Sequence, residues 1–116
     1  MRHRVKNAIL SRMKGPREAL LRNLATSVIL YEKVKTTKAR AKFVRPIVEK
    51  AITIGRRGDI NARRELTRMF PLVNAVKKLM EEIAPKYKTR AGGYTRITPL
   101  KRREGDGAEI VQIELV

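Results

Sequence analysis

The fold class depends on the stretch Glu109-Ile110-Val111-Gln112-Ile113-Glu114-Leu115, in which Val111, Ile113 and Leu115 alternate with the polar Gln112 and Glu114. A period of two is typical of a strand with one buried face. The turn-forming Gly105-Asp106-Gly107 precedes this stretch, and the β-prone Tyr94-Thr95-Arg96-Ile97 lies upstream of the turn. Together they predict a β-hairpin. Because an isolated two-stranded ribbon is only marginally stable in water, the hairpin must pack on other elements, with the short β-branched segment 33–36 as a third strand.

The residues before the hairpin show helical rather than strand spacing. Apolar side chains recur at intervals of three and four residues, which predicts four helices, at 16–31, about 38–55, 60–69 and 72–84. We therefore predict an α+β fold with a basic N-terminal arm, residues 1–15, and one domain, residues 16–116. That domain contains about four helices packed on a small sheet, formed by one short strand and the C-terminal hairpin.

The predicted helix boundaries follow from capping and breaking residues. Thr37 and Asp59 are good N-caps for the second and third helices. Pro46 should kink the second helix or remove one of its hydrogen bonds, and Pro85 should end the fourth. The only two phenylalanines, Phe43 and Phe70, are expected in the core.

The charge of the chain points to a polyanionic partner. Among 116 residues, 28 Lys and Arg face 11 Asp and Glu, for a net charge of +17. Residues 1–45 alone hold 13 Lys and Arg and 2 acids. A like-charged segment such as the arm usually becomes ordered on an anionic partner.

Several other classes of protein are disfavoured. The sequence has no cysteine for a disulfide or thiolate metal site, and no apolar run of the roughly 18 residues that a membrane span needs. Its one histidine, His3, lies in the arm, and the few acids do not group. We expect a cytoplasmic protein that is not an enzyme and uses no cofactor or metal.

Two stretches are candidates for nucleic-acid contacts. In residues 33–42, basic side chains flank a predicted helix N-terminus whose free amides could bind a phosphate. In residues 90–96, two glycines allow close backbone approach beside two arginines and Tyr94. Ordinary capping by Thr37 and a glycine-rich entry to the hairpin are the structural alternatives. Because only five residues are aromatic, we expect phosphate contacts rather than base stacking.

The sequence resembles the bacterial-type large-subunit ribosomal protein seventeen family over its whole length. The matching motifs, in chain order, are Met1-Arg2-His3-Arg4, Arg22-Asn23-Leu24-Ala25, Lys35-Thr36-Thr37 with Ala41-Lys42, Arg90-Ala91-Gly92-Gly93-Tyr94-Thr95-Arg96-Ile97, Gly105-Asp106 and Ile113-Glu114-Leu115-Val116. Each motif is weak alone, but the ordered set is specific.

The resemblance implies an α+β structural constituent of the large ribosomal subunit that binds and organises 23S ribosomal RNA near the peptide exit region. It implies neighbouring ribosomal proteins as partners, one copy per subunit, no homo-oligomer and no membrane. The residues expected to contact RNA are Arg2, His3, Arg4, Lys6, Arg12, Arg17, Arg22, Lys35, Thr36, Thr37, Lys38, Lys42, Arg90, Tyr94 and Arg96.

The alternative is a small basic DNA-binding protein with a helix-turn-helix formed by residues 60–69 and 72–84. A recognition helix should present base-reading side chains early in its length. The second of these helices has only Lys77 and Lys78 as basic residues, and the charge is concentrated elsewhere.

Overall fold

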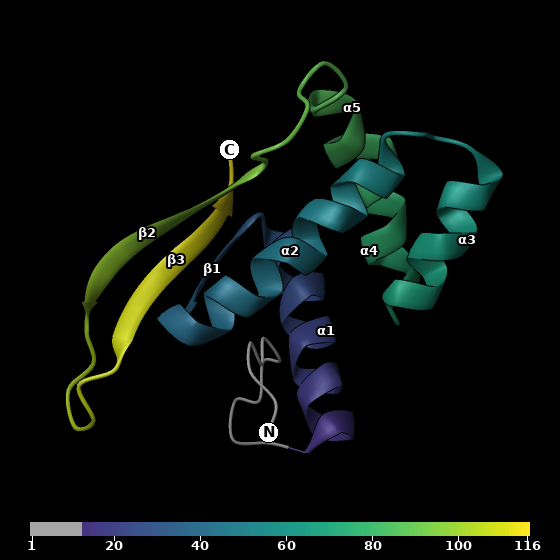
Figure 1. Cartoon of the computed structure of the whole chain (residues 1–116). Coiled ribbons are helices and arrows are strands. Elements are labelled where there is room, and N and C mark those ends of the chain that lie inside the picture. Colours follow the sequence, from purple (N-terminus) through teal and green to yellow (C-terminus); the bar gives the residue numbers. More distant parts are fainter. Residues whose placement is uncertain (1–12) are drawn as a thin grey trace, which may run out of the picture.

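The computed structural model of the chain describes residues 13–116. Helices lie on one side of the molecule and a three-stranded sheet lies on the other (Figure 1), which confirms the α+β prediction. The elements, in chain order, are α1 (Lys14–Tyr31), β1 (Lys33–Thr37), α2 (Lys38–Gly55), α3 (Ile60–Met69), α4 (Val73–Lys78), the π-helical turn η1 (Leu79–Ile83), α5 (Ala84–Lys86), β2 (Thr95–Arg102) and β3 (Glu109–Leu115).

The sheet has the order β1-β3-β2, and both pairs of strands are antiparallel. The predicted third strand is therefore confirmed, and β3 lies in the centre. The strand β2 is longer than its predicted segment and contains Pro99, where the register with β3 shifts. Proline cannot donate a ladder hydrogen bond, so it is tolerated here because β2 is an edge strand with an irregularity.

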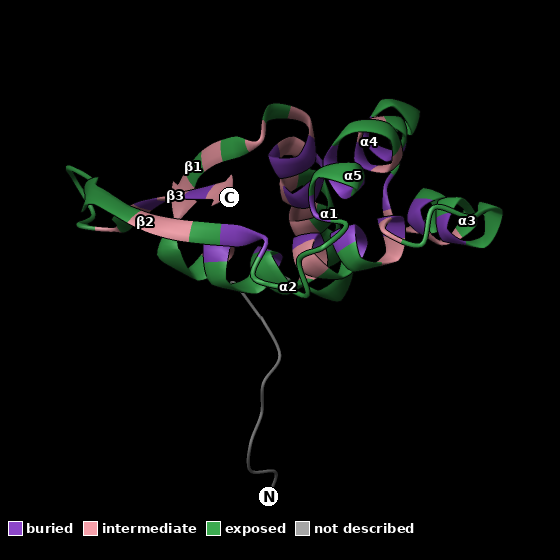
Figure 2. Cartoon of the chain, turned by 90° about the horizontal axis from the view of Figure 1, so that it is seen from above, coloured by how far each residue is buried: buried purple, intermediate pink, exposed green. Residues whose placement is uncertain are grey.

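One face of the sheet is covered by helices. The helix α2 contacts all three strands, and α1 contacts β1 and β3. The alternation predicted for β3 is confirmed, since Val111 and Ile113 are buried on the covered face. In Figure 2 the buried residues lie mostly among the helices, with others at the start of β2 and on β3, whereas the turn end of the hairpin is exposed.

The helix α1 packs tightly only in its second half. Its buried residues are Ala25, Thr26, Val28 and Ile29, and the half that precedes them projects from the body of the molecule (Figure 1). The helix begins at Lys14, two residues before the predicted start, so its proline lies within the first turn, where the missing N–H costs little.

The two phenylalanines have different environments. Phe70 is buried, as predicted, but the prediction for Phe43 is wrong because 38% of its surface is exposed. The buried stripe of α2 contains Val44 and Val48. Since neighbouring helical positions point about 100° apart, Phe43 falls beside the stripe and only partly covers the core.

The two predicted N-caps also differ. The Asp59 side chain accepts a hydrogen bond from the Ala62 amide at 2.7 Å, which confirms it as the cap of α3. Thr37 occupies the N-cap position of α2, but its hydroxyl makes no capping bond, so that part of the prediction is wrong. Thr37 is also the last residue of β1 and pairs with Ile110 of β3, so the strand as well as the helix sets its backbone position.

The last helical segment continues past its predicted end. The amide of Ala84 donates to the Leu79 carbonyl, five residues back, and the helix then runs on to Lys86. Pro85 lies just after this π-helical turn, where the i→i−4 ladder of the helix is already interrupted. Pro46 lies inside α2, which continues through it to Gly55.

Candidate nucleic-acid interface

In the described part of the chain, most Lys and Arg side chains form no ion pair with a carboxylate. Of the 28 Lys and Arg residues, four precede residue 13 and eight form ion pairs, so sixteen described cations have no carboxylate within ion-pair distance. A surface of this kind attracts polyanions and loses that attraction as salt rises. The eight paired cations are Lys38, Arg45, Arg57, Lys78, Lys86, Arg96, Arg102 and Arg103.

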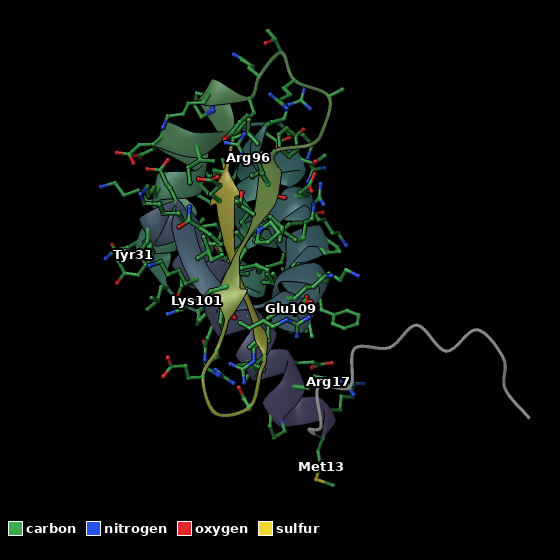
Figure 3. The ribbon with its side chains drawn as sticks, turned by 90° about the vertical axis from the view of Figure 1, so that its left-hand side faces the viewer. Met13, Arg17, Tyr31, Arg96, Lys101 and Glu109 are labelled. Carbon is green, nitrogen blue, oxygen red and sulfur yellow. The ribbon has the colours of Figure 1, made fainter. Side chains whose placement is uncertain are left out.

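The arm residues predicted to bind RNA lie outside the described residues: Arg2, His3, Arg4, Lys6 and Arg12. The two predicted residues of α1, Arg17 and Arg22, lie on its projecting half, where Figure 3 labels Arg17. Neither forms an ion pair within residues 13–116. These two guanidinium groups are therefore free to bind an anionic ligand.

The predicted residues of the central stretch divide between two surfaces. Thr37, Lys38 and Lys42 line a surface cavity of about 410 Å³ at the N-terminus of α2, together with Glu109, which pairs with Lys38 at 3.4 Å. Lys35 lies on the face of the sheet that the helices leave open. Thr36 alternates with it and is half-buried on the covered side.

The structure buries Tyr94, which sequence reasoning expected to contact RNA. Its ring is 1% exposed and packs on Tyr87 with ring centroids 5.1 Å apart. Its hydroxyl accepts a hydrogen bond from Arg56 Nη1 at 2.8 Å and donates one to the Arg90 carbonyl at 3.2 Å. Because no face of the ring is accessible, Tyr94 fits a role in the core, and it leaves the set of candidate RNA contacts.

Glu49 of α2 holds the segment before β2 in place. Its carboxylate accepts hydrogen bonds from the Gly93 amide at 3.2 Å, the Thr95 hydroxyl at 3.0 Å and Arg45 Nε at 2.9 Å. Burial alone would raise the pKa of Glu49, but the hydrogen bonds from Arg45 and Thr95 and the charge of Arg45 outweigh it and lower the pKa. Gly93 has φ +64°, a conformation that favours glycine.

Arg56 is a second residue that sequence reasoning missed in this role. Its guanidinium joins Tyr94 to the Lys88 carbonyl, which accepts from Nη2 at 3.0 Å, while its Nε is buried without a hydrogen-bond partner. The sequence shows Arg56 only as part of a basic pair after a helix. Its partner Tyr94 is 38 residues away, so no local pattern could indicate the contact.

The two arginines of the 90–96 segment point to different surroundings. Arg90 is exposed, and its Nε donates to the Gly92 carbonyl at 3.1 Å. Arg96 lies on β2 (Figure 3) and pairs with Glu114 at 3.2 Å. The structure thus distributes the predicted residues that it describes over the projecting α1, the α2 N-terminus, the open side of the sheet and the loop before β2.

The exposed aromatic rings do not form a stacking platform. Tyr31 on α1 and Phe43 on α2 are the two aromatic side chains of residues 13–116 with large exposure, whereas Phe70, Tyr87 and Tyr94 are buried. No cluster of three or more potential metal ligands occurs in the same range. Nor does any helix in it combine the length and apolar character of a membrane span.

A small α+β fold with this excess of unpaired cations defines a class, the basic proteins that lie against polyanions. Residues 20–116 match the family described as Ribosomal protein L17. The chain belongs to this family, and it is a structural component of the large ribosomal subunit.

Individual relatives agree with this assignment. A protein named Large ribosomal subunit protein bL17 from Exiguobacterium sp. is 50% identical over 112 residues, which cover 92% of this chain and 96% of the relative. Proteins of the same name from Thermoanaerobacter pseudethanolicus and Caldanaerobacter subterraneus are 55% and 53% identical over 107 residues, with the same coverage of both chains.

Proposed function

We propose that this chain binds and organises 23S ribosomal RNA within the large subunit, mainly through contacts of Arg and Lys with phosphates. The sixteen described cations without an ion-pair partner carry this proposal. Such a surface favours phosphate neutralisation, which positions a protein on folded RNA without reading bases. The scarcity of exposed aromatic rings argues in the same direction.

The proposed contacts come from the arm, residues 1–15, and from several folded elements. On α1 they are Arg17 and Arg22, which lie on its projecting half and have no ion-pair partner among the described residues. At the N-terminus of α2, the exposed Lys42 and the cavity beside it offer a place for a phosphate, and the unpaired amides of the first helical turn favour an anion there. The set is completed by Lys35, Thr36, Thr37, Lys38, Arg90 and Arg96, whereas Tyr94 is left out because its ring is buried.

The location of the protein is also part of the proposal. We place one copy per subunit near the peptide exit region, beside other ribosomal proteins, because the family resemblance implies it. Cross-linking of the purified large subunit tests this location: cross-links to proteins that line the exit region are expected. A set of cross-links confined to the opposite end of the subunit would contradict it.

The DNA-binding alternative has little support in the geometry of α3 and α4. Lys78, one of the two basic residues of α4, donates to the Leu30 carbonyl at 2.7 Å and pairs with Glu32 at 3.5 Å. It is therefore held against α1, and only Lys77 of that helix remains to meet a nucleic acid. A recognition helix needs several base-reading side chains near its start.

Binding measurements at several salt concentrations test the main proposal. The full chain is titrated with large-subunit RNA, with transcribed fragments of it and with a DNA duplex of equal length. We expect tighter binding to large-subunit RNA and a log–log salt slope of roughly −0.9 for each neutralised phosphate on a duplex. Equal or tighter binding to the DNA duplex at every salt concentration would contradict the proposal and favour the helix-turn-helix.

A further inference from the structure

The sheet presents an open face that the described helices leave uncovered. The outward residues follow from the register: Lys33, Glu114 and Arg96 lie side by side across the three strands, and Lys35, Gln112 and Thr98 form the next row. Thr37, Ile110 and Lys101 form the third row. We call these nine residues the open sheet face. Figure 3 looks onto it, with Arg96 and Lys101 labelled toward its two ends.

The open sheet face has four cations and one acid. Glu114 accepts from Arg96 Nε at 3.2 Å and from Gln112 Nε2 at 3.3 Å, so its charge is already satisfied within the sheet. Lys33, Lys35 and Lys101 are exposed and have no carboxylate within ion-pair distance. The face therefore presents three free positive charges from two different edge strands.

The remaining residues of the open sheet face make a protein partner the less favoured occupant. Its one apolar side chain, Ile110, is half-buried, and no aromatic ring lies among the nine residues. The buried centre of a protein interface is usually depleted in charge and rich in aromatic side chains. Thr98 and Gln112, by contrast, supply neutral hydrogen-bonding groups among lysines, which suits phosphate and sugar oxygens.

We propose that the open sheet face binds the sugar-phosphate backbone of the large-subunit RNA, with Lys33, Lys35 and Lys101 on phosphates and Thr98 and Gln112 on sugar or phosphate oxygens. Strands lie about 4.8 Å apart, and alternate residues along a strand lie about 6.7 Å apart. The three lysines are thus separated widely enough to reach different phosphates. This inference rests on the proposed function, because it names a surface for the same RNA.

If the open sheet face binds phosphates, neutralising two of its lysines should make the affinity for RNA depend less on salt. The two lysines chosen are not among the residues that the sequence predicted to contact RNA. The test variant is Lys33→Gln with Lys101→Gln, one substitution on each edge strand, and all three ion pairs of the sheet's acids, Glu109 and Glu114, are kept. The matched control is Lys50→Gln with Lys77→Gln, two exposed and unpaired lysines on α2 and α4. Binding to large-subunit RNA is measured from low to moderate salt.

We expect the slope of log affinity against log salt to become shallower by about 1.8 for the test variant, at about 0.9 per lost phosphate contact on a duplex, and to stay unchanged for the control. Circular dichroism and thermal unfolding must match the wild type in both. Acetylation of the wild-type chain gives a readout without substitutions: Lys33 and Lys101 should be protected by bound RNA, and Lys77 should not.

The outcomes separate this inference from the proposed function. If the wild-type chain shows no preference for large-subunit RNA, the proposed function fails, and the open sheet face loses its ligand with it. If the wild type binds but the test variant keeps the full slope and both lysines are acetylated in the complex, only the inference fails. Normal RNA binding with reduced incorporation into subunits would also overturn it and would assign the face to a neighbouring protein.

Discussion

At the scale of single residues, two long-range polar contacts hold the segment that enters β2. Tyr94 reaches Arg56, and Glu49 reaches the backbone and hydroxyl groups of residues 93 and 95. Both anchors connect this segment to α2, so they fix where Arg90 and Arg96 meet solvent. Each contact involves a polar group with limited access to water, where a missing partner is costly.

We expect Tyr94→Phe to lower the free energy of unfolding by about 1–2 kcal/mol, because it removes the hydroxyl between Arg56 and the Arg90 carbonyl and keeps the ring. Urea unfolding measures the change. Tyr31→Phe is the control, since Tyr31 is 71% exposed, and it should change stability by less than about 0.5 kcal/mol. Affinity for large-subunit RNA should hardly change in either variant. A large loss of affinity without a loss of stability in Tyr94→Phe would return Tyr94 to the RNA-contacting set.

Glu49→Gln should destabilise the chain by about 1–2 kcal/mol near neutral pH, because it weakens the hydrogen bonds of a carboxylate that is mostly shielded from water. The folded-state pKa of Glu49 lies below its ordinary value of 4.5. The contribution of the carboxylate is therefore present above that value and is lost as the pH falls through the folded-state pKa.

Urea unfolding at pH 7 and near pH 3 checks this, with Glu104→Gln as a control at a glutamate of the exposed hairpin turn. The difference in the free energy of unfolding between wild type and Glu49→Gln should be smaller at the lower pH. The difference between wild type and the control variant should stay near zero at both pH values. A gap that is equally large at both pH values would contradict the role of the ionised carboxylate.

The sequence singled out the segment 90–96 but gave no sign that the Tyr94 side chain is buried. The glycines and arginines are visible in the local sequence, and so is the turn that follows. The burial of Tyr94 depends on Tyr87, Arg56 and the end of α2, which only the tertiary fold brings together. The exposure of Phe43 has a similar origin, since a shift of one position around a helix decides between core and surface.

At the scale of elements, the helices and strands follow local rules and their ends depend on context. The spans predicted for α2, α3 and β3 agree with the structure, because apolar periodicity and turn residues specify them locally. The extension of β2 through Pro99 and of the last helix through Pro85 was missed. In both cases a proline lies where the regular hydrogen-bond pattern is already interrupted, namely at a register shift in an edge strand and just after a π-helical turn.

The two N-caps provide a matched test of helix capping. We expect Asp59→Ala to lower the free energy of unfolding by about 1 kcal/mol and to reduce hydrogen-exchange protection in α3, because it removes the bond to the Ala62 amide. Thr37→Ala, at a cap position without a side-chain hydrogen bond, should lower the free energy of unfolding clearly less. An equal cost for both would show that the Asp59 bond does not stabilise α3.

At the scale of the whole molecule, charge and core occupy different regions. The buried residues lie mostly among the helices and on the covered face of the sheet, while unpaired cations lie on α1, α2, α3, α4 and the open sheet face. The net charge in the sequence predicted a polyanionic partner but not this distribution. The cations of the open sheet face come together only through the pairing of strands far apart in the chain.

Removal of residues 1–12 should leave the fold intact and weaken RNA binding. The deletion ends before α1 and takes away four Lys and Arg, so the salt slope should become shallower by up to about 3.6 on duplex RNA. Thermal unfolding should stay cooperative, with a midpoint close to that of the full chain. A broad, non-cooperative transition would instead show that these residues support the folded domain.

The central place of β3 has a consequence for synthesis. The strands β1 and β2 do not pair with each other, and both wait for a segment that is translated about 70 residues after β1. At about 5–20 residues per second, β1 leaves the peptidyl-transferase centre several seconds before its partner exists. An interrupted chain therefore cannot align its lysines in one plane. The open sheet face forms only once β3 has been translated, so a chain that stops before residue 109 lacks the surface through which we propose that it binds RNA.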